Sequence, residues 1–396
     1  MKIAVPRETA AAESRVAATP DTVKRLVAQG ATVVIETAAG KTAMIPDADY
    51  QAFGAQIAPD RTATLKDADV VLTVRRPNAD TLADMASGTL LIGSLDPFGH
   101  EDEIAAIAKQ GVSAFSMEFM PRITRAQSMD VLSSQANLAG YQAVIEAATA
   151  YGRAMPMMMT AAGTVPAARV FIMGAGVAGL QAIATARRLG AVVTATDVRP
   201  AAKEQVESLG AKFIAVEDDE FKQAETSGGY AKEMSEDYRK KQAELVASHI
   251  AKQDIVITTA LIPGRPAPKL VNSAMLSSMK PGSVVVDLAA ERGGNVEGTV
   301  PGEVATVSDV TVIGYENMAG RIPASASALY AKNLFTFLET MIDKESKTLK
   351  PNWDDELLKA TCLTRDGAVV HPAFAPKQPE TPVMVAAGKE NEGASA

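Results

Sequence analysis

The chain has 396 residues, enough for two or three domains of ordinary size, and 47% of them are hydrophobic, as in folded proteins with a sizeable core. A formal net charge of −8 argues against a nucleic-acid partner, because phosphate backbones are bound by basic surfaces. Cys362 is the single cysteine and the three histidines are scattered, so an internal disulfide and a Cys-based zinc or iron–sulfur site are excluded, and we predict no metal centre.

The first third of the chain alternates short β-rich runs with helical stretches, a pattern that predicts a parallel sheet built from βαβ units. Between the first two runs, Thr19-Pro20-Asp21 is a helix-start signal with proline in the first turn, and Gly30 ends that helix. The predicted strands are Lys2–Val5, Thr32–Glu36, Asp69–Val74, Thr89–Gly93 and Val112–Ser116.

A second series of strands begins near residue 169, so the sequence predicts an α/β protein with two Rossmann-like doubly wound parallel-sheet domains and a cleft between them. Long helical patterns over 129–151 and 325–342 lie at the seams, and about 60 residues follow the last strand of the series. The predicted strands are Val170–Met173, Val192–Thr196, Lys212–Ala215, Asp254–Thr259, Ser283–Leu288 and Val310–Ile313.

These patterns predict a domain division in which the end of the chain returns to its beginning. We expect residues 1–130 with 325–375 to form a discontinuous first domain, and 131–324 to form the second. Residues 376–396, rich in Pro, Gly, Ala and Glu, are expected to be a disordered tail. The N-terminus is typical of a strand rather than a secretory signal, and the weakly charged stretch 154–186 is too interrupted by proline and glycine for a membrane helix.

The strongest local signal is a strand that runs directly into Gly174-x-Gly176-x-x-Gly179 and then into a helical pattern. The first glycine permits a tight turn, the second lets a pyrophosphate approach the backbone, and the third lets helix and strand pack closely. A second predicted strand ends in Asp197, 18 residues after Gly179. This context is the one that a dinucleotide-binding fingerprint requires.

Asp197 is expected to accept hydrogen bonds from the adenosine ribose hydroxyls and to repel the 2′-phosphate of NADP, which favours NAD(H) as the bound cofactor. The alternative is an ordinary acid after a strand, for example a helix N-cap. Arg199 lies close by, and an arginine there can accommodate a 2′-phosphate, so NADP(H) stays open as the less favoured cofactor.

Longer segments carry a family resemblance: 122–141 (RITRAQSMDVLSSQANLAGY), 157–166 (MMMTAAGTVP), 227–234 (SGGYAKEM) and 258–264 (TTALIPG). They closely resemble the NAD(H)-binding subunit of proton-translocating nicotinamide nucleotide transhydrogenase, and the resemblance runs from about residue 1 to 372. A wider resemblance to alanine dehydrogenase covers the same span, for example at 14–17 and 280–287.

The resemblance implies a Re/Si-specific transhydrogenase that is active only with partner subunits. In that family this subunit holds NADH, a partner subunit holds NADP(H), and hydride passes directly between the two nicotinamides while a membrane subunit moves protons. It further implies a homodimer, in the cytoplasm at the inner face of a bacterial plasma membrane. Because no membrane span follows residue 372, the sequence looks like the arrangement in which the NAD(H) subunit is a separate polypeptide.

The resemblance also assigns residues. Arg122, Gln127, Asp130 and Ser133 match the family segment at the nicotinamide and its ribose, where orientation of the ring is the task of the protein. The alternative is that these polar residues cap the seam helix. The remaining expected NAD(H) contacts, beside the three glycines and Asp197, are Val177, Ala178, Val198, Arg199, Tyr230, Thr259 and Leu261.

The charged segment 217–244 contains Gly228-Gly229-Tyr230. Composition alone favours a solvated helix and loop. The resemblance implies instead the mobile loop of the family, which closes over bound nucleotide with Tyr230 near the site.

Two other functions remain open. An alanine dehydrogenase needs cations for the keto-acid carboxylate, which Arg15 and Arg75 could supply, and also a general acid/base. The histidine expected for that role is replaced by Ser94, and the expected aspartate aligns with Glu291, so we disfavour this function. The third hypothesis is a non-catalytic NAD-binding protein.

Overall fold

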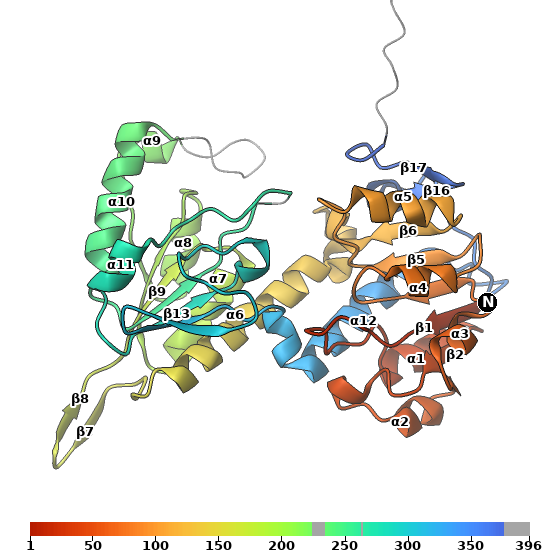
Figure 1. Cartoon of the computed structure of the whole chain (residues 1–396), viewed down its shortest axis with the longest axis horizontal. Coiled ribbons are helices and arrows are strands. Elements are labelled where there is room, and N and C mark those ends of the chain that lie inside the picture. The colour runs from red at the N-terminus through yellow and green to blue at the C-terminus, as the bar shows by residue number, and fades with distance from the viewer. Residues whose placement is uncertain (224–233, 263, 376–396) are drawn as a thin grey trace, which may run out of the picture.

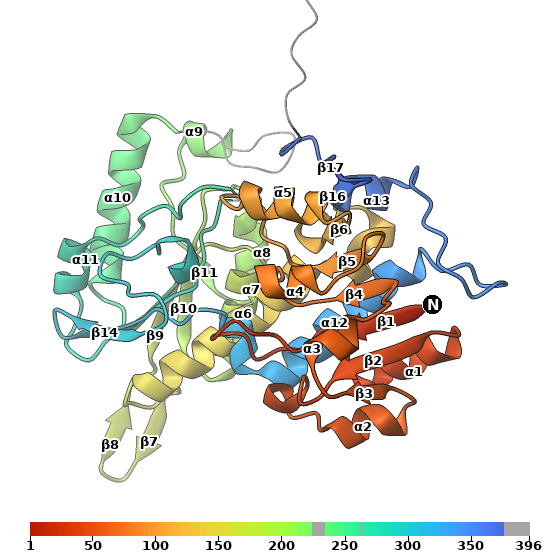
Figure 2. The same cartoon turned by 45° about the vertical axis from the view of Figure 1, so that its right-hand side comes forward.

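The computed structural model describes residues 1–223, 234–262 and 264–375, which form two parallel-dominated α/β bodies joined by two long helices (Figures 1 and 2). This architecture confirms the predicted fold class. The expected disordered tail over 376–396 lies outside the described residues, and so does Tyr230 with the centre of the expected mobile loop.

The first sheet has eight strands in the order β17-β16-β6-β5-β4-β1-β2-β3. Strands β1 to β6 pair in parallel, whereas β16 runs antiparallel to β6 and β17 antiparallel to β16. The strands are β1 (Lys2–Val5), β2 (Thr32–Glu36), β3 (Gln56–Ala58), β4 (Val70–Leu72), β5 (Leu90–Gly93), β6 (Ser113–Ser116), β16 (Cys362–Arg365) and β17 (Ala368–Val369).

Alternating strand residues bury both faces of this sheet. Ile3 and Val5 of β1 join a core with the helices α1, α12 and α13, while Ala4 between them joins a second core with α3, α4 and α5. The helices of this body are α1 (Pro20–Ala28), α2 (Asp47–Ala52), α3 (Arg61–Leu65), α4 (Ala79–Ala83), α5 (Glu101–Lys109), α12 (Pro323–Glu339) and α13 (Glu356–Thr361), with the 3₁₀ turns η1 (Lys41–Ala43), η2 (Met117–Phe119) and η3 (Thr124–Met129).

The second sheet has seven strands in the order β11-β10-β9-β12-β13-β15-β14. They are β9 (Arg169–Met173), β10 (Val192–Thr196), β11 (Lys212–Phe213), β12 (Ile255–Thr258), β13 (Val284–Asp287), β14 (Val304–Val307) and β15 (Val310–Ile313). The helices are α7 (Val177–Arg188), α8 (Ala202–Ser208), α9 (Asp219–Lys222), α10 (Glu236–Ile250) and α11 (Ser273–Ser278), with the 3₁₀ turns η4 (Ala290–Arg292) and η5 (Met318–Arg321). Strand order reverses between β9 and β12, and ligands bind at the carboxyl ends of strands at such a switch point.

Two tight hairpins explain strands that the sequence patterns did not predict. Ser308-Asp309 joins β14 to β15, and Asp366-Gly367 joins β16 to β17. All four turn residues have positive φ, between 52° and 79°, as two-residue type I′ turns require. A third hairpin, β7 (Met158–Thr160) with β8 (Gly163–Val165), projects away from the second body (Figure 1).

The seam helices α6 (Val131–Ala150) and α12 tie the two bodies together. Gly140 of α6 lies so close to α7 that a Cβ atom there would sit 2.0 Å from the carbonyl oxygen of Ala178. The buried hydroxyl of Tyr330, on α12, lies 3.1 Å from the carbonyl oxygens of Thr73 and Val74 at the end of β4. After α12 the chain pairs β16 with β6, and from these contacts we propose the domain division 1–130 with 325–375, and 131–324.

Candidate nucleotide-binding site

The turn after β9 explains why each glycine of the fingerprint is needed. Gly174 has φ +107°, and a Cβ there would meet the Thr259 hydroxyl oxygen at 2.4 Å. A Cβ on Gly179 would lie 1.8 Å from the carbonyl oxygen of Gly174, because α7 packs directly on the turn. Apart from Gly176 and its two chain neighbours, no described residue has a heavy atom within 4 Å of the Cβ position of Gly176. Gly174 and Gly179 are therefore required by the fold, whereas Gly176 leaves open space.

Helix α7 begins at this open space. Its N-cap is Gly176, and among the described residues no side chain caps it and no acidic residue lies in its first turn. Val177 is exposed and Ala178 half-buried. The first N–H groups of a helix have no partner within the helix and carry its positive dipole end, so this terminus can bind a phosphate.

Asp197 follows β10, the neighbour of β9, and fixes the turn. Its Oδ2 accepts a hydrogen bond of 2.7 Å from the Ala175 N–H, inside the glycine turn. The Arg199 guanidinium forms a bidentate ion pair with it, from Nε to Oδ1 at 2.9 Å and from Nη2 to Oδ2 at 3.0 Å. Val198 between them is 57% exposed. The acid thus lies beside the turn, with its carboxylate paired to Arg199.

The loop after β12 forms the other side of the turn. The Thr259 hydroxyl donates to the Gly174 carbonyl at 3.1 Å, and Leu261 is 53% exposed. Asn295 is fully buried and holds this loop by two hydrogen bonds with the backbone of Ala260, of 3.0 and 2.9 Å. Sequence reasoning missed Asn295, because its role depends on a contact across 35 residues.

The four residues expected at the nicotinamide lie around the start of α6. Asp130 is the N-cap of that helix, and its carboxylate accepts hydrogen bonds from the Ser133 N–H at 2.9 Å and from the Ser133 hydroxyl. Arg122 and Gln127 are exposed. The capping alternative therefore describes Asp130 and Ser133 in this structure. Among the described residues no hydrogen bond joins the four to the glycine turn, and their link to it is α6 itself, which contacts α7 at Gly140.

Polar contacts join the loops at the carboxyl ends of the two sheets. Arg75, after β4, pairs with Glu13 at 2.8 Å and with Glu291 of η4 at 3.3 Å. Asp96, after β5, pairs with Arg292 of the same turn. The switch-point edge of the second sheet therefore faces the first body.

A buried cluster of acidic and basic side chains lies next to Arg75. Arg15 makes a bidentate pair with Glu13, with both distances 2.7 Å. Burial opposes ionisation of Glu13, but the hydrogen bonds and charge of Arg15 outweigh it and lower the pKa of that carboxyl. Glu8 accepts from the Val74 N–H at 2.6 Å, and its burial raises its pKa to about 7. Ser94 bonds through its N–H and its hydroxyl to the Tyr330 hydroxyl, at 2.9 and 3.2 Å.

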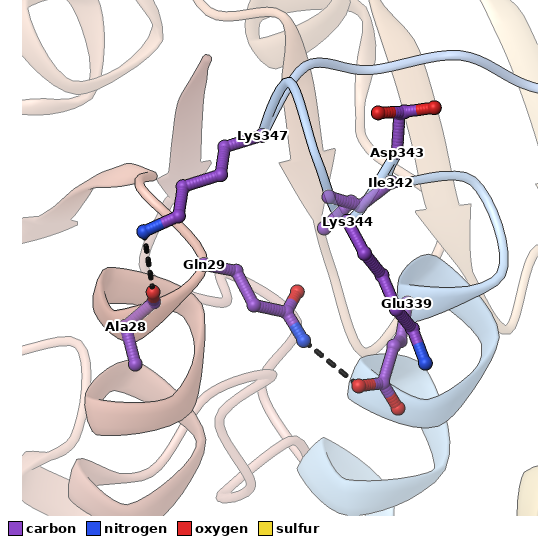
Figure 3. A pocket seen from close by; sticks show the side chains of 7 residues that line it. All are labelled: Ala28, Gln29, Glu339, Ile342, Asp343, Lys344 and Lys347. Atoms are coloured by element: carbon purple, nitrogen blue, oxygen red, sulfur yellow. Dashed lines mark hydrogen bonds between the residues drawn. The ribbon is translucent and has the colours of Figure 1, made fainter.

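A cavity of about 270 Å³ lies elsewhere, between the C-terminal ends of α1 and α12 (Figure 3). Gln29 donates to Glu339 across it at 2.8 Å, and Lys347 donates to the Ala28 carbonyl at 3.4 Å. Its lining comes from the first body alone and contains none of the residues predicted to bind nucleotide.

Two family models match the chain almost end to end: the alanine dehydrogenase/PNT N-terminal domain over residues 4–139, and the alanine dehydrogenase/PNT C-terminal domain over 143–372. The chain therefore belongs to the alanine dehydrogenase/PNT family, which confirms the predicted family. Within residues 1–223, 234–262 and 264–375, no helix is both long and apolar enough to cross a membrane.

Particular relatives lie on both branches of that family. The chain is 54% identical to an NAD(P) transhydrogenase subunit alpha polypeptide of Rhodospirillum rubrum, with 94% of this chain and 99% of that protein covered. It is 31% identical to alanine dehydrogenase of Halomonas elongata, with 95% and 96% covered. Among solved structures, transhydrogenase from Sinorhizobium meliloti matches with a TM-score of 0.86 and 60% identity, covering 93% of this chain and 100% of that one.

Proposed function

We propose that this chain is the NAD(H)-binding subunit of a proton-translocating transhydrogenase. The main support for an NAD(H) site is the open space at Gly176 beside the uncapped start of α7, together with Asp197 at the end of the neighbouring strand. The reaction is proposed from the NAD(P) transhydrogenase relative at 54% identity. Bound NADH supplies the hydride, which a second nicotinamide, on NADP⁺ held by a partner subunit, accepts.

The residues of this chain bind and orient the nucleotide in this proposal. The first turn of α7, with Gly176, Val177 and Ala178, binds the pyrophosphate, and Asp197 binds the adenosine ribose. Val198, Thr259 and Leu261 complete the walls of the site. Arg122, Gln127, Asp130 and Ser133 position the nicotinamide end, together with Tyr230 from outside the described residues. No acid or base is needed, because hydride passes between two rings.

The alanine dehydrogenase alternative is weaker on chemical grounds. Both guanidiniums that could hold a keto acid pair with carboxylates of the chain, Arg15 with Glu13 and Arg75 with Glu13 and Glu291. Ser94 offers a hydroxyl bonded to Tyr330, and a hydroxyl moves no proton near neutral pH without an adjacent base.

Mixing subunits tests the proposal. With a matched NADP-binding subunit, we expect hydride exchange between NADH and an NADP⁺ analogue, and we expect the chain alone to bind NADH without consuming it. NADH oxidation by the chain alone with pyruvate and ammonium would establish the dehydrogenase instead. Normal NADH binding without exchange would establish a non-catalytic NAD-binding protein.

We further propose a homodimer that associates with NADP-binding and membrane subunits at the cytoplasmic face of a bacterial membrane. The β7–β8 hairpin supports the dimer, because Met158 and Met159 on this projecting element are 42% and 79% exposed, and Met157 just before it is 57% exposed.

Charged residues on this hairpin are expected to separate the protomers. Met158→Asp with Met159→Asp should lower the mass measured by light scattering to that of one chain, because a carboxylate in an apolar interface loses its water. Met44→Asp is the matched control, since Met44 is 78% exposed on the first body, and it should keep the dimer mass. A dimer that survives the double substitution would remove the hairpin from the interface.

A further inference from the structure

The carboxylate of Asp197 is fully occupied. An ionised carboxylate has about four acceptor positions. Described residues supply four donors to it: the backbone N–H groups of Ala175 and Arg199 at 2.7 and 2.9 Å, and the Nε and Nη2 groups of the Arg199 side chain at 2.9 and 3.0 Å. A ribose hydroxyl reaches this carboxylate only when one of these donors leaves.

The two pairs of donors differ in how easily they leave. The backbone N–H groups of Ala175 and Arg199 belong to the turn and the strand end, so they stay with the fold. The guanidinium is on a flexible side chain that is 32% exposed, against 7% for the Asp197 side chain, so it can turn away from the carboxylate without moving the backbone. It also donates two hydrogen bonds, the same number that the vicinal hydroxyls of a ribose donate.

We propose that the Arg199 side chain is a displaceable occupant of the ribose subsite, exchanged for the ribose hydroxyls when NADH binds. The proposal rests on the NAD(H) site proposed above, and it replaces the NAD(H) contact that the family resemblance implies for Arg199. Breaking the ion pair is part of the cost of each binding event, so Arg199 sets the affinity of the site below what Asp197 alone would give. The chain thereby holds NADH less tightly.

The same exchange affects the choice between dinucleotides. A displaced guanidinium stays two residues from Asp197, where it offsets part of the repulsion between that carboxylate and a 2′-phosphate. Without Arg199, the Asp197 carboxylate repels the 2′-phosphate with no guanidinium charge beside it to offset the repulsion. Preference for NADH over NADPH should therefore increase when the arginine is removed.

Arg199→Ala tests the exchange through equilibrium titration of NADH on the full chain. We expect the Kd to fall two- to fivefold, the fold-change that matches loss of a partly exposed arginine–carboxylate pair. The Kd for NADPH should fall less or rise. Arg199→Lys keeps the charge but not the bidentate geometry, so its Kd for NADH should lie between those of the wild type and Arg199→Ala. Lys203→Ala is the matched control, because Lys203 pairs with Glu217 in the loop before α9, and the Kd of this variant for NADH should equal that of the wild type.

The outcomes separate this inference from the proposed function. A higher Kd for Arg199→Ala would mean that the guanidinium binds the nucleotide, and an unchanged Kd would mean that no exchange occurs; either result overturns the inference while the NAD(H) site stands. Failure of the wild-type chain to bind NADH would overturn the proposed function itself. A nitrogen-15 spectrum adds a direct readout, in which the protected Nε–H signal of Arg199 should be lost when NADH is added.

Discussion

Replacing Asp197 by alanine is expected to raise the Kd for NADH by about 10- to 100-fold. Hydrogen bonds from the ribose to a charged acceptor are lost, and a total contribution of roughly 1.5–3 kcal/mol from such bonding corresponds to this range. The Kd for NADPH should change less, or fall, because the charge that repels its 2′-phosphate is removed while Arg199 remains. Titration of both nucleotides on one preparation measures both effects.

Asp197 also holds the glycine turn through Ala175, so a control for structure is needed. Asp197→Asn keeps one acceptor oxygen but removes the charge and turns an amide NH2 toward one of the two backbone N–H donors, so it should lower the melting temperature less than Asp197→Ala while losing most discrimination against NADPH. Equal Kd values for wild type and Asp197→Ala would remove Asp197 from the ribose site and leave it as a turn-fixing acid.

The second large effect is a difference in stability between the variants Gly176→Ala and Gly179→Ala. Gly179→Ala should lower the melting temperature by about 5–10 °C, because its new methyl group meets the Gly174 carbonyl at 1.8 Å and overpacking of this kind costs roughly 1–3 kcal/mol. Gly176→Ala should keep the melting temperature, because its φ of −75° suits any residue and, apart from the chain neighbours, no described residue lies within 4 Å of the new atom.

The two variants should rank the other way in NADH affinity: Gly176→Ala, the more stable variant, is expected to bind NADH more weakly than Gly179→Ala. The Gly176→Ala methyl group fills the space that the pyrophosphate needs, so we expect the Kd for NADH to rise at least about tenfold in a fully folded protein. Calorimetry and NADH titration on the same samples give both quantities. Wild-type affinity in Gly176→Ala would place the phosphates elsewhere than at the start of α7.

Much of the fold follows from local sequence patterns. The bounds predicted for β1, β2, β10 and β15 agree with the structure, because apolar β-branched runs between turn residues specify strands buried on both faces. The hairpin turn Asp366-Gly367 is a strong local signal that could have identified β16 and β17. Ser308-Asp309 is a weaker one, which is why β14 was not predicted.

Local sequence patterns also identified part of the candidate site. The glycine turn and Asp197 were found because their spacing along the chain is fixed by one strand–turn–helix–strand unit. The capping role of Asp130 and Ser133 is also local, since an N-cap acid and a partner three residues later belong to the first turn of one helix. The nicotinamide role of these two residues stays a proposal.

By itself, the sequence determined the α/β class, most of the strands and the dinucleotide fingerprint, since each depends on backbone preferences within a few residues. Only the tertiary structure decided that β16 pairs with β6, that Asn295 holds the loop after β12, and that Arg199 fills the acceptor positions of Asp197. The first two join residues far apart in the chain, and the third depends on a side-chain rotamer. Such contacts are selected by the packing of whole layers and by competition among donors, and no local spacing encodes them.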